Sequence, residues 1–308
     1  MADFVKFKPE ENNEEKSQKR YRRRRINFKG IFLLFLLFFL VSSIISSITY
    51  SITPKIAVIP IKGVISSEAS SSVFGSTLSS RDIADQIRSL KDDSSVKAIL
   101  IDINSPGGSP VASEEISRAI EDTKKEKPVY AIINDIGASG GYWIGVSADK
   151  LYASKLSVVG SIGVTSAGLS YENLIKDYNI TYRQQTAGKY KDLGSPFREQ
   201  TQEEKEIMQK LLDDLHSEFK IHISKSRNIS LEELEEYAQG QIFLGEEAKE
   251  IGLIDDIGYY DSTIDELRNI TSQNAIIINY EPEPSLIDIL KINSIFEIPK
   301  AENQILFK

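Results

Sequence analysis

The sequence predicts an α/β fold built from parallel β-α-β units, and three stretches of the chain support this prediction. KAILIDIN (97–104) and PVYAIIND (128–135) are short apolar runs rich in β-branched residues, which is typical of buried strands. Between them, ASEEISRAIEDTKK (112–125) has apolar residues at the spacing of an amphipathic helix. Strands that alternate with helices indicate a parallel sheet, whose functional loops lie at the carboxyl ends of its strands.

The other elements are predicted from the same periodicities. Runs of β-branched residues predict strands over 55–65, 150–164, 181–186 and 275–285. The first of these, 55–65, could also be a hairpin with a glycine turn. Helical spacing predicts helices over 81–90, 140–148, 171–178, 201–228, 230–240 and 259–269. The serine-rich stretch 66–80 is predicted to be a flexible loop.

A membrane anchor is predicted near the N-terminus. Residues 30–53 carry no charge, and Ile31 to Tyr50 supplies the roughly 20 mostly apolar residues that a spanning helix needs. Residues 1–29 hold ten Lys/Arg and five Asp/Glu, and basic residues beside such a segment stay in the cytoplasm. The alternative is a cleaved signal peptide, but the basic region is long for one and no A-x-A site follows. We therefore expect a single-pass protein of the cytoplasmic membrane, with its N-terminus inside and its main domain outside.

Composition excludes several classes of function. The chain contains no cysteine, which excludes disulfides and thiolate metal or redox sites. Its formal charge is −8 overall and +5 over residues 1–29, so the remainder carries −13, which argues against nucleic-acid binding by the main domain. The sequence has no Walker loop, EF-hand or Cys/His cluster, so we expect neither a metal nor another cofactor.

The first functional signal is NDIGASGGYWIG (134–145), which follows a predicted strand. Its glycines on either side of Ser139 fit the G-x-S-x-G elbow of serine hydrolases. A serine hydroxyl is a poor nucleophile until a base takes its proton. The two histidines, His216 and His222, lie six residues apart on one predicted helix and therefore do not share a face. A glycine-marked loop carrying Lys191 offers another base, although composition alone would make it a solvated loop.

Four segments resemble the signature segments of one family. They are IDINSPGGSP (101–110), GASGGYWIG (137–145), VVGSIGV (158–164) and GKYKDLGSPFRE (188–199), in this order. They look like those of the signal peptide peptidase A family, membrane-anchored serine proteases of the ClpP/crotonase superfold with its repeated β-β-α units. The resemblance covers roughly residues 55–270.

Domain boundaries follow from the resemblance and the anchor together. They predict a cytoplasmic basic tail over 1–29, an anchor over 30–53 and a protease domain over 54–270. Residues 271–308 remain as a C-terminal extension of unknown role.

The resemblance also implies roles for individual residues. Ser139 matches the nucleophile, Lys191 matches the lysine base, and Ser161 matches a serine that hydrogen-bonds this lysine. One oxyanion donor is assigned by resemblance to Gly108, and the other is expected to be the Gly140 N–H, where a strand gives way to a helix. A lysine base must be neutral, whereas free lysine has a pKa near 10.4, so such a site must exclude water.

Partners and substrates are implied in the same way. Short members of the family are ring-like oligomers in which the serine and lysine of one site come from adjacent chains. We therefore expect a homo-oligomer with shared sites, since one domain of about 200 residues has little surface with which to enclose a lysine and a peptide groove. The implied substrates are signal peptides already cut from preproteins and left in the bilayer.

Other classes of function stay open. An α/β-hydrolase type of esterase or peptidase would use His216 or His222 as its base. A catalytically inactive scaffold of the crotonase superfold would keep a peptide groove but would not react with a fluorophosphonate at Ser139. The third alternative is an acyl-CoA enzyme of that superfold, which usually works with Glu or Asp. The pairing of Ser139 with Lys191 and the expected extracytoplasmic location both count against this alternative.

Overall fold

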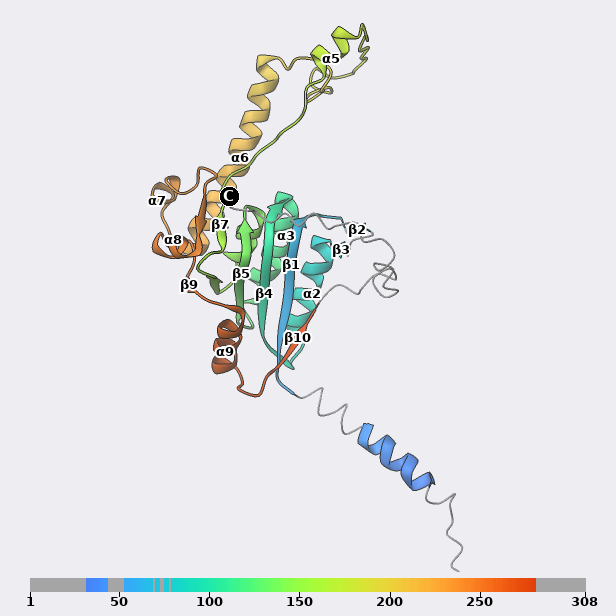
Figure 1. The fold of residues 1–308 in the computed structure, drawn as a ribbon, viewed down its shortest axis with the longest axis vertical. Helices are drawn as coiled ribbons and strands as arrows, with labels where there is room; N and C mark the ends of the chain where they lie inside the picture. Colours follow the sequence, from blue (N-terminus) through green and yellow to red (C-terminus); the bar gives the residue numbers. More distant parts are fainter. Residues whose placement is uncertain (1–31, 44–52, 69, 73–74, 78, 281–308) are drawn as a thin grey trace, which may run out of the picture. The chain divides into compact units, whose positions relative to one another are not determined.

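The computed structural model describes residues 32–43, 53–68, 70–72, 75–77 and 79–280 (Figure 1). The chain divides into two compact units, residues 1–52 and 53–308. In the first unit, residues 32–43 form a helix. No helix within the described ranges combines the length and the apolar character needed to cross a membrane. The predicted anchor over 30–53 extends on both sides of this helix into residues outside the described ranges, and the whole predicted tail 1–29 lies outside them. Both the anchor and the tail therefore stay predictions.

An eight-stranded sheet organises the second unit. Its strands are β1 (Lys55–Ile65), β4 (Val96–Gly108), β5 (Val129–Ala138), β6 (Lys150–Ala153), β7 (Val158–Gly160), β8 (Ile242–Leu244), β9 (Asp256–Ile257) and β10 (Ile276–Asn279). The order is β10-β1-β4-β5-β6-β9, while β7 pairs with the end of β5 and β8 pairs with β7. These pairings are parallel except that of β7 with β8. Two short strands, β2 (Ser70–Ser72) and β3 (Gly75–Thr77), form a separate antiparallel pair.

Both faces of the central strands are buried. Fully buried side chains of β4 alternate between the two faces, with Ile99, Ile101 and Ile103 on one and Ala98 and Leu100 on the other. Helices α2 (Ser80–Asp92) and α3 (Pro110–Thr123) pack on the first face, and α9 (Tyr260–Ile270) covers the second (Figure 1). Burial on both faces explains why these strands are unbroken apolar runs in the sequence.

The remaining helices of this unit surround the sheet or lead away from it. They are α4 (Gly140–Gly145), α5 (Glu172–Asp177), α6 (Gln202–Arg227), α7 (Leu231–Glu235) and α8 (Gly245–Glu250). Helix α6 begins at the capping box of Thr201 and Glu204 and ends at Asn228, whose φ is +54°. Its apolar contacts with the core come from its C-terminal half, where Phe219 and Ile223 are buried. Figure 1 shows its first half leading away from the sheet towards α5.

Most predicted elements are present, and the differences have physical reasons. The strand predicted over 181–186 is wrong: these residues are exposed and have no partner strand, without which a strand is not stable. Residues 55–65 form one strand, because Gly63 at φ +73° marks a shift of register rather than a hairpin turn. The stretch predicted as one strand over 150–164 contains two, β6 and β7, and the helix predicted over 230–240 ends at Glu235.

Short elements escaped prediction because they hold too few residues for a periodicity. These are β8, α8, β9 and the β2–β3 pair within the predicted loop 66–80. Strand β10 lies within the predicted extension 271–308, yet it pairs in parallel with β1. This part of the extension therefore belongs to the sheet, and residues 281–308 lie outside the described ranges.

Candidate active site

Three of the four signature segments meet at the carboxyl edge of the sheet. The ends of β4 and β5 are paired through Ser105 and Gly137, and the end of β5 is paired with β7 through Ala138 and Gly160. The turn after β4, the turn at Ser139 and the turn after β7 therefore lie side by side. This is the placement expected of functional loops in a parallel sheet.

Ser139 occupies the tight turn between β5 and α4, as the N-cap residue of that helix. Its backbone has φ +51° and ψ −121°, which few non-glycine residues adopt. Its N–H donates to Gly160 O at 2.8 Å, and its carbonyl accepts from Trp143 N at 2.9 Å, so hydrogen bonds fix both sides of the turn. The side chain is half-buried and makes no capping bond to the helix. Its hydroxyl is therefore not occupied by the capping role that its position would suggest.

Glycines allow the last residues of β4 to approach Ser139 at backbone distance. A methyl group added to Gly107, whose φ is +102°, would stand 2.7 Å from Gly140 N and 2.8 Å from Ser139 Cβ. A methyl group added to Gly140 would stand 3.3 Å from Gly108 N and 2.3 Å from Ser113 Oγ. The backbone nitrogens of Gly108 and Gly140 are thus close to each other beside the serine. An oxyanion hole needs two amide donors in this arrangement.

Ser105 holds the glycine-containing end of β4 in place from the interior. It is fully buried, and its hydroxyl donates to Gly63 O at 2.6 Å and accepts from Gly107 N at 3.1 Å. One side chain thereby ties the glycine turn to β1. Sequence reasoning did not assign a role to Ser105, although its place directly before the Pro-Gly-Gly turn was a signal that could have found it.

Ser161 lies beside the turn of Ser139, whereas the hydrogen bond from Ser161 to Lys191 that the resemblance implies stays a prediction. It follows β7 with φ +51°, the same unusual sign as Ser139, and is half-buried. Its N–H donates to Gln241 O at 2.8 Å. Because the preceding carbonyl, that of Gly160, accepts the N–H of Ser139, the two serines are held by adjacent backbone hydrogen bonds.

Lys191 lies in a different part of the second unit. It belongs to an extension, residues 164–200, which contains α5 and in which no residue is buried. The ion pairs of this extension join it to itself or to the first turn of α6, as Arg198–Asp192 and Arg198–Glu204 do. Figure 1 shows α5 and its surroundings at the end of α6 that is remote from the sheet. Within one chain, the fourth signature segment is therefore not brought to Ser139.

The two histidines are engaged elsewhere. His216 Nε2 lies 2.7 Å from Ala238 O, and His222 Nε2 lies 3.1 Å from Trp143 O. The His222 ring stacks on that of Trp143, with centroids 4.5 Å apart, and burial lowers the pKa of His222. Both rings serve the packing of α6 against its neighbours. This arrangement does not support either of them as the base for Ser139.

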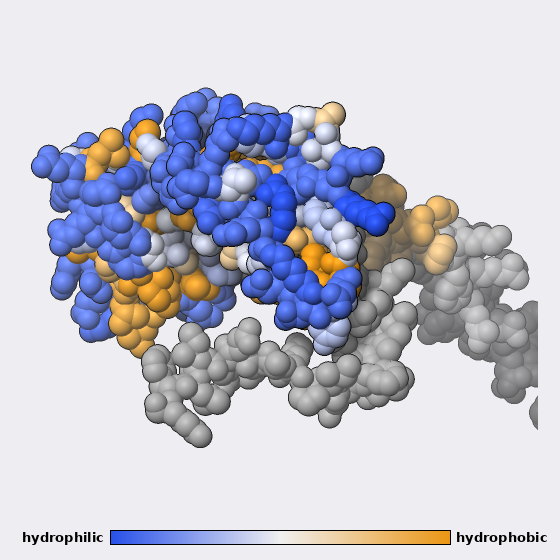
Figure 2. Space-filling view, turned by 90° about the horizontal axis from the view of Figure 1, so that it is seen from above, coloured by the Kyte–Doolittle hydropathy of each residue, from blue (hydrophilic) through white to orange (hydrophobic). Residues whose placement is uncertain are grey.

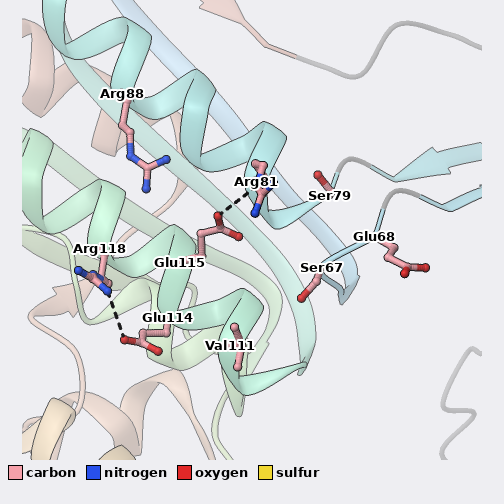
Figure 3. Close-up of a pocket in the computed structure, with 9 residues that line it drawn as sticks. All are labelled: Ser67, Glu68, Ser79, Arg81, Arg88, Val111, Glu114, Glu115 and Arg118. Atoms are coloured by element: carbon pink, nitrogen blue, oxygen red, sulfur yellow. Dashed lines mark ion pairs between the residues drawn. The ribbon is translucent and has the colours of Figure 1, made fainter.

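Two further features of the described residues bear on where a site can lie. In that part of the chain, no three or more His, Asp and Glu side chains are grouped so that they could hold a metal ion. A hollow of about 840 Å³ lies between α2 and α3 (Figure 3). Its lining includes the ion pairs Arg81–Glu115 at 3.8 Å and Arg118–Glu114 at 3.9 Å, and none of the predicted catalytic residues. We therefore do not assign the hollow to the candidate active site.

Comparison with known proteins identifies the family of the chain. The profile of peptidase family S49 matches residues 121–274. A candidate protease of Methanocaldococcus jannaschii is 39% identical over 62% of this chain and 62% of its own length. A candidate signal peptide peptidase SppA of Enterococcus faecium is 32% identical over 74% of this chain and 67% of its own length. The chloroplastic serine protease SPPA of Arabidopsis thaliana is 31% identical over 66% of this chain and 30% of its own length.

Fold and site together define a class, the serine proteases that carry an elbow serine on an α/β sheet. Within this class the chain belongs to peptidase family S49, as the family profile and the relatives named SppA show. The family resemblance of the four sequence segments is thereby confirmed. The match to the first two relatives spans about two thirds of their lengths.

Proposed function

We propose that the chain is a membrane-anchored serine endopeptidase with Ser139 as nucleophile and Lys191 as general base. The observation that carries this proposal is the backbone of Ser139, at φ +51°, held beside the nitrogens of Gly108 and Gly140. A non-glycine residue keeps such a conformation only where its surroundings enforce it, and such residues cluster at functional sites. Helix capping alone does not require this conformation, since capping residues are ordinarily extended.

The proposed reaction is acyl transfer to serine followed by hydrolysis. The hydroxyl oxygen of Ser139 attacks the peptide carbonyl carbon while its proton passes to the neutral amine of Lys191. The N–H groups of Gly108 and Gly140 stabilise the oxyanion that forms. As the C–N bond breaks, Lys191 returns the proton to the leaving amine, and it then activates the water that hydrolyses the acyl-enzyme. Ser161, beside Ser139, orients the lysine amine.

In this proposal Lys191 reaches Ser139 from a neighbouring copy of the chain. In one chain Lys191 is exposed and belongs to the extension around α5, which Figure 1 shows at the end of α6 remote from the sheet, whereas a neutral amine requires a site that excludes water. Apolar side chains of the extension and of the first half of α6 are also exposed, and a neighbouring copy would cover them: Leu169, Leu174, Tyr178, Ile180, Ile207 and Leu211. Figure 2 shows hydrophobic patches set in a largely hydrophilic surface. Repetition of one such interface closes a ring.

The proposed substrates are signal peptides that remain in the membrane after their release from preproteins. Support comes from the apolar stretch Ile31 to Tyr50, which would keep the enzyme at the bilayer, and from the relative named as a signal peptide peptidase. The basic residues 1–29 support a topology with the N-terminus in the cytoplasm and the protease domain on the other side of the cytoplasmic membrane. An alkaline phosphatase fused after about residue 300 should then be active in a bacterial host, and a fusion reporter active only in the cytoplasm would contradict this topology.

Peptide cleavage by full-length protein in detergent tests the catalytic assignment. We expect Ser139→Ala to be inactive and Lys191→Ala to lose about 10³-fold or more in kcat/KM. The value of kcat/KM should rise with pH, because the base must lose a proton before it can act. The double variant His216→Gln with His222→Gln is the matched control and should stay within about threefold of wild type. A folded double-histidine variant without activity would contradict the lysine base.

A further inference from the structure

The extension that carries Lys191 contains one cation whose hydrogen-bonding capacity is fully used, that of Arg198. A guanidinium group has five N–H donors in a rigid plane. Nε donates to Asp192 Oδ2 at 2.7 Å, and Nη2 donates to Asp192 O at 3.0 Å and to Glu204 Oε1 at 2.6 Å. Nη1 donates to Glu204 Oε2 at 2.9 Å and to Glu199 O at 3.1 Å. Arg198 thus joins three points of the chain in one fixed geometry.

One of these points is the residue directly after Lys191. The second carboxylate oxygen of Asp192 accepts from the hydroxyl of Tyr182 at 2.9 Å, so both oxygens of this carboxylate are held. The backbone here is a series of turns, in which Lys191 N donates to Gly188 O at 3.2 Å and Ser195 N donates to Asp192 O at 3.1 Å. The direction in which the Lys191 side chain leaves the turn is therefore set by contacts of its neighbour.

The other principal point is the first turn of α6. Glu204 is only 3% exposed, although the extension around it has no buried residue. Its carboxylate also accepts from Thr201 N at 2.9 Å, which is half of the capping box that starts the helix. The bidentate bond from Arg198 lowers the pKa of Glu204 to about 2, so this carboxylate stays ionised near neutral pH. The turn of Lys191 is thus fixed to the start of α6.

The far end of α6 is fixed to the body of the protease. The helix has 26 residues and is therefore on the order of 39 Å long. In its C-terminal half, Phe219 packs on Trp143 with ring centroids 5.1 Å apart, and Ile223 is fully buried. Trp143 belongs to α4, the helix that begins directly after Ser139. Packed rings, one helix and the bonds of Arg198 therefore connect the nucleophile's helix with the turn of Lys191.

We propose that Arg198 is a positioning residue for the proposed proteolysis: it fixes the turn of Lys191 to α6 and so places the amine, without touching the substrate. The inference rests on the proposed function, since it gives Lys191 the role of base. The neighbouring ion pair Lys189–Glu203 has no such character, because its side chains are 67% and 50% exposed. Exposed pairs of this kind contribute little to structure.

Arg198→Lys tests the proposal in full-length protein, because it keeps the charge and loses the planar fork. We expect kcat to fall by about 10- to 100-fold while KM changes less than about threefold, since a displacement near 1 Å costs this much in rate. Acylation of Ser139 by a fluorophosphonate should slow in parallel. Lys189→Gln is the matched control and should keep kcat within about twofold of wild type, because it removes only contacts of an exposed side chain, namely the pair with Glu203 and the contact with the Tyr190 ring at 5.1 Å.

A double-mutant cycle separates positioning from general integrity. If Arg198 acts through Lys191, Arg198→Lys should change the acylation rate less than about twofold in a Lys191→Ala background. An equal loss in both backgrounds, or an unchanged kcat in the single variant, would overturn the proposal. Full activity of Lys191→Ala would instead refute the role of Lys191 as the base. The Arg198 variants do not test that role, so failure of the proposed function and failure of the Arg198 proposal can be told apart. Should Arg198→Lys fail to fold by circular dichroism, Glu204→Gln tests the same bidentate bond with the same expected loss.

Discussion

The surroundings of Ser139 and those of Lys191 are built from different interactions. Ser139 is held by backbone hydrogen bonds and by neighbouring glycines, which lie so close to its turn that a methyl group added to them would not fit. Lys191 lies among exposed residues, in a turn that is fixed by the side-chain bonds of Arg198. The nucleophile is therefore placed by steric contact in a packed sheet edge, and the lysine is placed by charged groups at the end of a long helix.

Under the proposed function, this difference leaves a single chain preorganised at Ser139 and incomplete at Lys191. Backbone contacts leave Ser139 and its two amide neighbours little freedom, so each chain by itself holds the part of the site that we propose for acyl transfer. The charged turn of Lys191 has no apolar cover of its own, and it gains a dry environment only against another surface. Changes at the sheet edge should consequently act on catalysis directly.

The largest effect is expected at the glycine turn. In Gly107→Ala, the new methyl group would lie 2.7 Å from Gly140 N, and the residue would keep φ +102° only under strain, so the two amides must separate. We expect kcat/KM to fall by about 100-fold or more, as when an oxyanion donor is removed. Gly168→Ala, which meets nothing within 4 Å, is the control and should be unaffected. Wild-type kcat/KM in a folded Gly107→Ala protein would show that the turn does not take part.

A smaller effect is expected at Ser105, which supports the same turn. Ser105→Ala leaves the N–H of Gly107 without its 3.1 Å acceptor, so the turn should become less well ordered. We expect a loss of about tenfold in kcat together with about 1–3 kcal/mol in the free energy of urea unfolding. Ser117→Ala removes a buried serine that bonds Ser147 at 2.5 Å, and it should cost stability without lowering kcat. Equal kcat values for the two variants would argue against a positioning role of Ser105.

Much of the sheet edge could be predicted from the sequence because its signals are local. Apolar runs gave the parallel strands, and the glycines around Ser139 and before Ser109 marked turns at their ends. The strand wrongly predicted over 181–186 shows the limit, since TYRQQT has β-branched and aromatic residues but finds no partner to pair with. The support from Ser105 and Arg198 could not be foreseen, because it depends on contacts 42 and 6 residues away along the chain. The separation of Lys191 from Ser139 within one chain does not follow from the order or spacing of the motifs, and the expectation of a shared site came from the family resemblance alone.

The smallest effect is expected at His222, beneath α4. Burial lowers its pKa, so the unfolded chain binds a proton more readily than the folded one. The contribution of the neutral His222 ring to the free energy of unfolding is therefore fully present above about pH 6.5. It is lost as the pH falls from there towards the lower pKa of the folded state. His222→Gln should show a shallower decline in the free energy of unfolding between pH 7.5 and 5.5 than wild type. Identical declines in both proteins would contradict this account of the ring.

Complementation between two inactive variants tests most directly whether Ser139 and Lys191 meet across a subunit boundary. Ser139→Ala protein and Lys191→Ala protein should each be inactive alone. Co-expressed in equal amounts and shown to form mixed oligomers, they should recover about a quarter of the wild-type activity, because a site needs an intact serine in one chain and an intact lysine in the next around a ring. If both residues acted within one chain, no chain of the mixture would carry a complete site. Proven mixed oligomers without activity would therefore contradict the shared site.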